Sequence, residues 1–380
     1  MERTTETVAI IGAGIGGLYL AAQLGIAGFK LRLHDIDAAK LTEIRARGGI
    51  DVEGERGGFA AIERATTDLG AAVDGADVII VVTGGNAQTV VARSLALLLL
   101  SGQAILLIQG NTGGALVVRR ALDDAGCRAD VFIAEMDNYP YACWRLGPTR
   151  IRLIVRKRWL QIASFPGNRI GVVFPRLSPL FPEAVAAPNI LYTGFTNANA
   201  MLHVANCVAN AARIESGDGY KFYAEGVTPA VARLYEAINA ERVAIAGALG
   251  APVPTLADWF DRVYGVRETT LVETCRRLTF NSDGPYQATG TPKSLDHKFF
   301  TEDVPTGLIP MSALAAAAGV ETPAINALVE VARCMTGKDF AAEGRTLERL
   351  GLSGMNRRQI QRVMEEGFSS GDENSTKLSR

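Results

Sequence analysis

The chain has 380 residues, of which 48% are hydrophobic and 21% are charged. This composition excludes collagen-like, low-complexity and wholly disordered chains, and the length predicts two or at most three domains. Thirty-nine basic residues against forty acidic ones leave a net charge of -1, so no overall field attracts nucleic acid or an anionic membrane.

The cysteines and the apolar segments indicate where the protein works. The five cysteines form no CxxC pair, so neither a disulfide framework nor a zinc site is expected, and a reducing compartment fits best. No apolar run reaches the roughly 18 residues that a membrane span needs. The apolar segment 8–24 follows Glu2 and Glu6, which does not fit a signal peptide. We expect a cytoplasmic protein without a bound metal.

The first 110 residues alternate between short apolar runs and helical stretches, which predicts a parallel sheet with helices on both faces. A helix is expected from Gly17, and the expected strands are residues 7–11, 29–33, 77–82 and 104–109. Residues 150–173 predict antiparallel strands appended to this sheet, most clearly at 151–156 (IRLIVR).

From residue 199 onward the pattern becomes mostly helical. Thr228 and Thr322 each precede a proline in the first turn of an expected helix. The expected helices are 204–215, 229–249, 310–318, 323–336 and 357–366. The expected fold class is therefore α/β followed by all-α: a Rossmann-type doubly wound dinucleotide-binding domain (1–188), a C-terminal α-helical domain (189–368) and a flexible tail (369–380).

A glycine-rich turn stands between the first expected strand and the first expected helix. It matches G-x-G-x-x-G over Gly12, Ala13, Gly14, Ile15, Gly16 and Gly17. In this motif the first glycine permits the tight turn, the second lets the backbone approach a pyrophosphate, and the third lets the helix pack on the strand. The helix N-terminus then attracts the phosphates. Because strand, turn and helix occur in this order, a dinucleotide fits better than a glycine-rich turn of some other α/β domain.

Asp35 lies 23 positions after Gly12, at the end of the second expected strand. An aspartate there accepts hydrogen bonds from the ribose hydroxyls and repels a 2′-phosphate, which favours NAD over NADP. Lys40 and Arg45 follow closely and could offset the repulsion, so NADP stays an alternative.

Polar residues also follow two later strands, at the edge where open α/β folds bind ligands. Thr83 is the candidate there for the cofactor. Gln109 and Asn111 are candidates for hydrogen bonds to the nicotinamide or to the substrate, and the alternative is an ordinary polar loop.

A general acid/base at neutral pH usually comes from histidine, and the chain has three: His34, His203 and His297. A lone histidine on an apolar helix, as at His203, is more often a buried core residue. A carboxylate partner changes that interpretation, since it holds one tautomer and stabilises the imidazolium. The sequence does not say which carboxylate pairs with it; the candidates are Asp296, Glu302 and Asp303.

Several motifs together resemble the opine dehydrogenase family, which includes octopine, nopaline and carboxyethyl-amino-acid dehydrogenases. The motifs are the glycine-rich turn, Tyr141-Ala142-Cys143, the region 199–215 and Glu302-Asp303-Val304-Pro305 followed by Gly307-Leu308. The resemblance implies that His203 is the general acid/base and that Asp303 completes the dyad. It also implies that Lys298, where the family usually has arginine, binds the carboxylate of a keto acid, although lysine lacks the bidentate fork.

The resemblance further implies an NAD(P)H-dependent oxidoreductase acting on CH–NH bonds. An α-keto acid such as pyruvate would condense with an amino acid or amine to an imine, and hydride would then reduce the imine. Gln109 would contact the substrate or the nicotinamide. Two alternatives remain, an amine-independent keto-acid reductase similar to ketopantoate reductases and a non-catalytic dinucleotide sensor. A homodimer contact through the helix from about Arg357 is compatible with the sequence, without further support.

Overall fold

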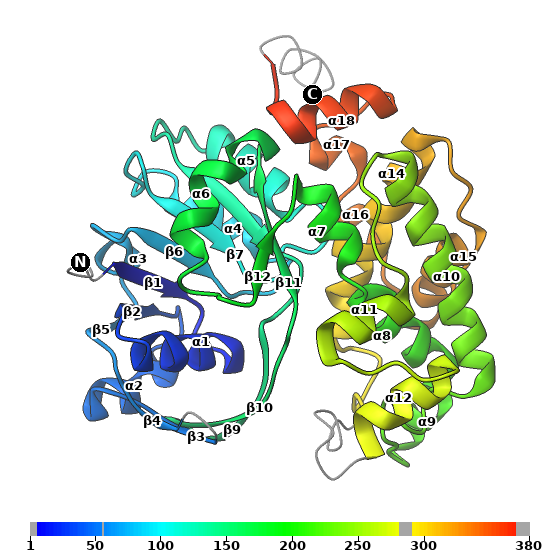
Figure 1. The fold of residues 1–380 in the computed structure, drawn as a ribbon, viewed down its shortest axis with the longest axis horizontal. Helices are drawn as coiled ribbons and strands as arrows, with labels where there is room; N and C mark the ends of the chain where they lie inside the picture. The colour runs from blue at the N-terminus through cyan, green and yellow to red at the C-terminus, as the bar shows by residue number, and fades with distance from the viewer. Residues whose placement is uncertain (1–5, 55–56, 281–290, 370–380) are drawn as a thin grey trace. The chain divides into compact units, whose positions relative to one another are not determined.

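The computed structural model describes residues 6–54, 57–280 and 291–369. The chain divides into two compact units (Figure 1). The first comprises Met1–Gly110 and Gly114–Pro188, and the second comprises Asn111–Gly113 and Asn189–Arg380. The tail predicted from residue 369 lies, apart from that residue, outside the described residues.

An eight-stranded sheet forms the centre of the first unit, in the order β12-β11-β8-β7-β6-β1-β2-β5. Its strands are β1 (Thr7–Ile11), β2 (Lys30–His34), β5 (Arg64–Thr66), β6 (Val78–Val81), β7 (Ala104–Leu107), β8 (Phe132–Met136), β11 (Leu160–Phe165) and β12 (Ala184–Ala186). Neighbouring strands pair in parallel except β8 and β11, which are antiparallel. The strand order reverses between β1 and β6, and a crevice at such a point, beyond the carboxyl ends of the strands, is where this topology binds ligands.

Helices follow most of these strands, and the predicted doubly wound Rossmann-type fold is confirmed. They are α1 (Ile15–Ile26), α2 (Ala38–Arg47), α3 (Leu69–Val73), α4 (Gln88–Leu95), α5 (Gly114–Asp124) and α6 (Ile170–Leu177). The strand predicted at 7–11 agrees with β1 to the residue, and helix α1 begins two residues before the predicted start.

A second sheet, of four strands in the order β4-β3-β10-β9, corrects one prediction. Its strands are β3 (Gly49–Glu53), β4 (Gly58–Ala61), β9 (Tyr141–Gly147) and β10 (Arg150–Arg156). The segment 150–173 therefore does not simply extend the parallel sheet: β10 pairs with β9 and β3, and residues 170–177 form helix α6. Only β11 joins the main sheet as an antiparallel strand. The apolar run IGVVF suits a strand or a buried helix equally well, and periodicity alone does not distinguish them.

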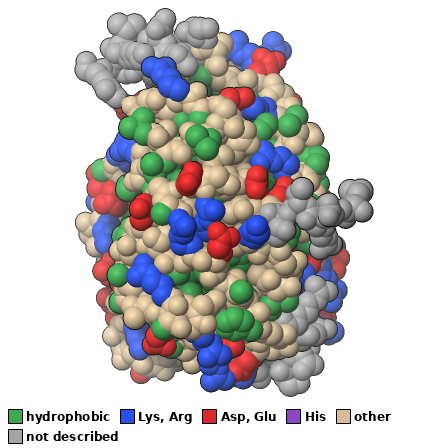
Figure 2. All heavy atoms as spheres, turned by 90° about the vertical axis from the view of Figure 1, so that its left-hand side faces the viewer, with side chains coloured by type: hydrophobic (Ala, Val, Ile, Leu, Met, Phe, Trp, Pro, Cys, Tyr) green, Lys and Arg blue, Asp and Glu red, His purple; other side chains and the backbone are tan. Residues whose placement is uncertain are grey.

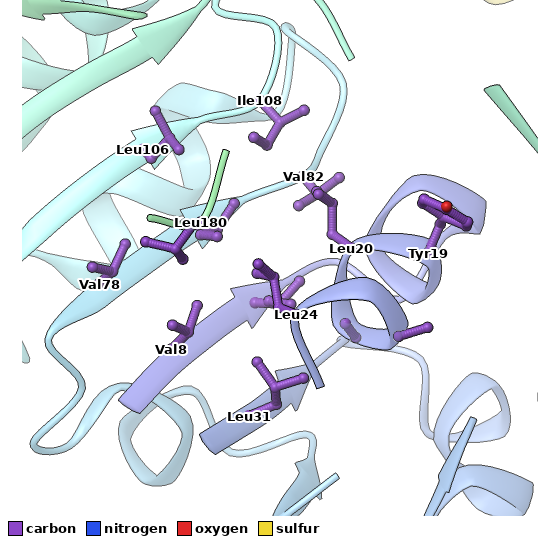
Figure 3. Close-up of a cluster of buried hydrophobic side chains, with 14 of the residues drawn as sticks. Val8, Tyr19, Leu20, Leu24, Leu31, Val78, Val82, Leu106, Ile108 and Leu180 are labelled. Carbon is purple, nitrogen blue, oxygen red and sulfur yellow. The ribbon is translucent and has the colours of Figure 1, made fainter. Parts of the chain in front are cut away.

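Apolar side chains of the strands and of α1 form the core of the first unit (Figure 3). Val8, Leu31 and Val78 come from neighbouring strands, and Leu20 and Leu24 come from one face of α1; all five are at most 2% exposed. This packing holds α1 against the sheet, so the turn that precedes α1 has a defined position.

All regular elements in the described part of the second unit are helices. They are α7 (Ile190–Thr196), α8 (Asn199–Ala209), α9 (Ala211–Ser216), α10 (Pro229–Ala248), α11 (Leu256–Tyr264), α12 (Leu271–Phe280), α13 (Lys298–Thr301), a π-helical turn (Val304–Leu308), α14 (Ile309–Ala318), α15 (Pro323–Thr336), α16 (Phe340–Glu343), α17 (Leu347–Leu350) and α18 (Arg357–Glu366). The helix predicted over 204–215 is in fact two helices, because the chain bends at Asn210. The Asn210 amide donates to Asn206 O and Gly226 O.

Surface charges are mixed in sign on the face drawn in Figure 2, where basic and acidic side chains alternate among the described residues. The arginines of β10 also have acidic partners: Arg150 and Arg152 pair with Glu53, and Arg156 pairs with Glu183. Among the described residues, no helix has the length and apolarity needed to span a membrane. The same part of the chain holds no cluster of three or more potential metal ligands.

Candidate active site

The glycine-rich turn between β1 and α1 has the geometry that its sequence predicts. Gly12 has φ of +113°, and a Cβ there would lie 2.8 Å from Val82 O. A Cβ at Gly17 would lie 1.7 Å from Gly12 O, so this position allows no side chain. At Gly14, by contrast, a Cβ would meet no atom within 4 Å, which leaves the backbone open to a close approach.

The residues around this turn fit a dinucleotide. Gly14 is the N-cap of α1 and offers no side-chain acceptor, so the first N–H groups of the helix lie at a terminus with partial positive charge. The hydroxyl of Thr83 is buried and has no hydrogen-bond partner among the described atoms. A buried hydroxyl without a partner is unfavourable by roughly 1–3 kcal/mol, and contact between Thr83 and a dinucleotide stays a prediction.

Asp35 lies at the carboxyl end of β2 and is 6% exposed. Its Oδ2 accepts from Ala13 N at 2.7 Å, and its Oδ1 accepts from Asp37 N at 2.9 Å. Lys40 Nζ lies 3.2 Å from both carboxylate oxygens. Burial acts to raise the pKa of Asp35, but these donors outweigh it and the pKa is lowered. Asp35 is therefore a carboxylate at neutral pH and is tied to the glycine-rich turn.

The loop after β7 contains two left-handed residues that are not glycine. Gln109 has φ of 63° and Asn111 has φ of 58°, conformations that cost energy outside glycine and often mark functional sites. Asn111 belongs to the second unit, where its Nδ2 donates to Thr306 Oγ1 at 2.9 Å and its Oδ1 accepts from Asn197 at 2.9 Å. The Asn111 side chain is thus hydrogen-bonded within the second unit, and contact with a ligand stays a prediction for both residues.

In the helical unit, His203 of α8 and Asp303 lie in direct contact. His203 Nδ1 is 2.7 Å from Asp303 Oδ2, and both side chains are largely buried, at 13% and 6% exposure. A carboxylate accepts but does not donate, so Nδ1 carries the hydrogen and Nε2 keeps its lone pair in the neutral ring. Asp296, the other aspartate considered, instead pairs with Lys338 at 2.8 Å on the surface.

Gly307 allows this contact to form. Asp303 directly precedes the π-helical turn (Val304–Leu308), which packs on α8. A Cβ at Gly307 would lie 2.4 Å from Ala200 Cβ in the first turn of α8. Only glycine therefore permits the close approach that brings the Asp303 carboxylate to the ring of His203.

Replacement of Gly307 by alanine is expected to destabilise the protein by about 1–3 kcal/mol, because the added methyl group overpacks a closed contact. The free energy of unfolding measured with denaturant tests this. Gly247→Ala in α10 is the matched control, since a Cβ there meets no atom within 4 Å. Equal stability of the two variants would contradict the argument.

Aromatic residues that the sequence analysis did not single out surround the His203 ring. Phe299 stacks on it with centroids 3.9 Å apart and planes at 22°. The hydroxyl of Tyr223 lies 3.4 Å from Nε2. Phe299 directly follows Lys298, so its place in the same motif could have marked it as a residue near His203. Tyr223 lies 20 positions from the histidine and has no local signal.

Lys298 is the first residue of α13. The N-cap of this helix is His297, and its Nδ1 accepts a hydrogen bond from Phe299 N at 3.3 Å. The Lys298 side chain is exposed, and no ion-pair partner for it occurs within the described residues. Contact between Lys298 and a substrate stays a prediction.

Cys207 lies four positions after His203 and is fully buried. Burial, and to a smaller extent the charge of Asp303, raises the pKa of the Cys207 thiol to about 12. A thiol that stays protonated at neutral pH is a poor nucleophile. Cys207 is a packing residue beside the dyad.

Comparison with known proteins supports this reading of the chain. Residues 186–336 match the family described as NAD/NADP octopine/nopaline dehydrogenase, alpha-helical domain. The opine dehydrogenase of Arthrobacter sp. (strain 1C) is 36% identical over 362 residues, which cover 95% of this chain and 99% of that protein.

Solved structures share the fold at lower sequence identity. Octopine dehydrogenase with NADH and L-arginine has a TM-score of 0.75 and 20% identity, covering 94% of this chain and 98% of that chain. Yersinopine dehydrogenase with NADP+ bound has a TM-score of 0.74 and 18% identity, and the match covers 97% of this chain and 99% of that chain. The sequence likeness over nearly the whole length confirms the resemblance drawn from the motifs. The chain belongs to the opine dehydrogenase family of NAD(P)-dependent oxidoreductases.

Proposed function

We propose that the protein joins an α-keto acid such as pyruvate to the amino group of an amino acid or amine, by reduction of an imine with NAD(P)H. The observation that carries the proposal is the 2.7 Å contact between His203 Nδ1 and Asp303 Oδ2. The L-arginine and NADH in the octopine dehydrogenase structure support an amino acid and a nicotinamide cofactor as ligands.

His203 exchanges protons at Nε2. Nε2 first takes a proton from the ammonium group of the amine substrate, and the protonated ring then donates to the keto oxygen and polarises the carbonyl for attack by the freed amine. The oxygen takes the Nε2 proton as the C–N bond forms, and the nitrogen returns a proton to Nε2. That proton then passes to the hydroxyl, which leaves as water when the C–O bond breaks. Asp303 accepts from Nδ1–H throughout and stabilises the imidazolium.

Other residues hold the reactants. Lys298 binds the carboxylate of the keto acid, and Gln109 contacts the substrate or the nicotinamide. The glycine-rich turn, Asp35 and Thr83 hold the dinucleotide, which supplies the hydride to the imine carbon when it is bound.

The test is NADH and NADPH oxidation with a panel of α-keto acids, each with and without amino acids and amines. Oxidation that requires both substrates is the expected result. Oxidation with a keto acid alone would instead establish an amine-independent reductase. Cofactor binding without turnover, unchanged by His203→Ala, would indicate a dinucleotide sensor.

We propose NAD as the preferred cofactor, because the Asp35 carboxylate would face a ribose. Asp35→Asn is expected to lower the ratio of kcat/KM for NADH to that for NADPH by about tenfold or more, the value of a charged hydrogen bond. The control is Asp37→Asn, since Asp37 only caps α2 through Ala39 N. A ratio that does not change would exclude Asp35 as the source of the preference.

Lys298→Met is expected to raise KM for the keto acid by roughly tenfold or more, because it removes a charged hydrogen-bond donor. KM for the cofactor should stay the same. Lys293→Met changes another exposed lysine of the same segment and serves as the control. Equal KM values for the keto acid in the two variants would remove Lys298 from the site.

A cytoplasmic location is also proposed. All five cysteines lie in the described part of the chain and form no disulfide, which fits a reducing compartment. A homodimer stays a prediction, and light scattering of the purified protein tests it.

A further inference from the structure

We propose that Tyr223 is a further catalytic residue. Its hydroxyl and Nε2 of His203 form a pair of donors that hold one oxygen atom, the oxygen that the keto acid loses as water. This inference rests on the proposed function, because it assigns a step within the same reaction.

The distance between the two donor atoms carries the argument. Tyr223 Oη lies 3.4 Å from His203 Nε2. Two atoms at this separation share positions that are about 2.8–3.0 Å from both, which is the hydrogen-bond distance. Nδ1 is occupied by Asp303 at 2.7 Å, so Nε2 is the ring atom that meets the substrate. Both His203 and Tyr223 are partly buried rather than fully enclosed.

The same helix positions both residues. His203 and Asn206 lie three positions apart on one face of α8, and Asn210, four positions further on, is the C-cap of that helix. Asn206 Nδ2 donates to Phe222 O at 2.9 Å, and Asn210 Nδ2 donates to Gly226 O at 3.1 Å. The segment that carries Tyr223 is therefore attached on both sides of it to the helix that carries His203.

Side chains around the pair restrict its movement further. The Phe222 ring packs against the Tyr223 ring with centroids 5.0 Å apart, and Phe299 stacks on the His203 ring. A Cβ at Gly226 would lie 2.7 Å from Asn206 Oδ1, so the segment lies as close to α8 as glycine allows. Donors held in place before the reaction stabilise developing charge without reorganisation.

The chemical role requires no proton from Tyr223. Its hydroxyl donates to the keto oxygen, which gains negative charge as the C–N bond forms. It then donates to the resulting hydroxyl group until the C–O bond breaks. The proton that leaves with the water comes from Nε2 of His203, and the phenol keeps its own proton throughout.

Tyr223→Phe tests the proposal. It keeps the ring packing and removes the hydroxyl alone. We expect kcat/KM for the keto acid to fall by about 10²-fold, as when one oxyanion donor is removed, with the melting temperature and NADH binding unchanged. The control is Tyr192→Phe in the same unit, where the hydroxyl bonds Gly250 O on the surface. A loss within about threefold, less than a typical hydrogen bond provides, would overturn the proposal.

A second measurement does not depend on turnover. With three histidines in the chain, ¹⁵N labelling resolves few ring signals. In Tyr223→Phe we expect the Nε2 signal of His203 to shift while those of His34 stay the same. An unchanged Nε2 signal would overturn the inference by itself. Absence of turnover by the unaltered protein with every keto acid and amine would instead overturn the proposed function.

Discussion

His203→Gln is expected to lower kcat/KM for the joint use of keto acid and amine by about 10²–10⁴-fold, the contribution of a positioned general acid/base. Glutamine has a similar size and can donate a hydrogen bond. It cannot exchange the proton that the keto oxygen takes and the leaving water carries away. Steady-state NADH oxidation with both substrates measures the loss.

NADH binding by the same variant should be unchanged, because the glycine-rich turn and Asp35 lie in the first unit and His203 lies in the second. Fluorescence titration with NADH separates the two effects. Near-normal turnover in His203→Gln would remove His203 from the mechanism, whereas loss of NADH binding would point to misfolding.

Asp303→Asn is expected to lower kcat by about 10²–10⁴-fold, a loss comparable to that of His203→Gln but with a different cause. An asparagine amide donates where the carboxylate accepts, so Nδ1 becomes the acceptor and the hydrogen moves to Nε2. The imidazolium also loses its counter-charge. A carboxylate-to-amide change beside a catalytic histidine acts through this wrong tautomer. The kcat values of the purified variants measure it.

Asp296→Asn is the matched control for this variant. Asp296 lies seven positions earlier, is 77% exposed at its side chain and pairs with Lys338. Its variant should have near-normal kcat. The reverse result, loss in Asp296→Asn and activity in Asp303→Asn, would show that the contact in the structure is not the catalytic one.

Structural elements that depend on neighbouring residues in the sequence were predicted well. The strand, turn and helix around Gly12 depend on residues within about 15 positions, and each glycine serves a local steric need. Helix α15 (Pro323–Thr336) agrees with its prediction to the residue, since Thr322-Pro323 marks its start locally. Helix α18 (Arg357–Glu366) also agrees, with an Asn356 capping box at its first turn.

Long-range pairing was predicted less well. The hairpin of β9 and β10 joins β3, about 100 positions earlier in the chain, and no periodicity within the hairpin encodes that partner. The break at Asn210 was missed for a similar reason. Its amide bonds Gly226 O in a segment that follows the helix, so the tertiary contact outweighs the local preference for a continuous helix.

By itself, the sequence determined the dinucleotide-binding turn, the α/β-then-α order and, through its resemblance to a family, the pair His203 and Asp303. These depend on local backbone geometry or on motifs that can be read along the chain. Only the tertiary structure showed that the Asp303 carboxylate lies in direct contact with the ring of His203, that Asn111 is held in the helical unit, and that the Tyr223 hydroxyl lies beside Nε2. Each depends on packing between segments distant in sequence, such as the approach of Gly307 to α8, and no local pattern specifies such packing.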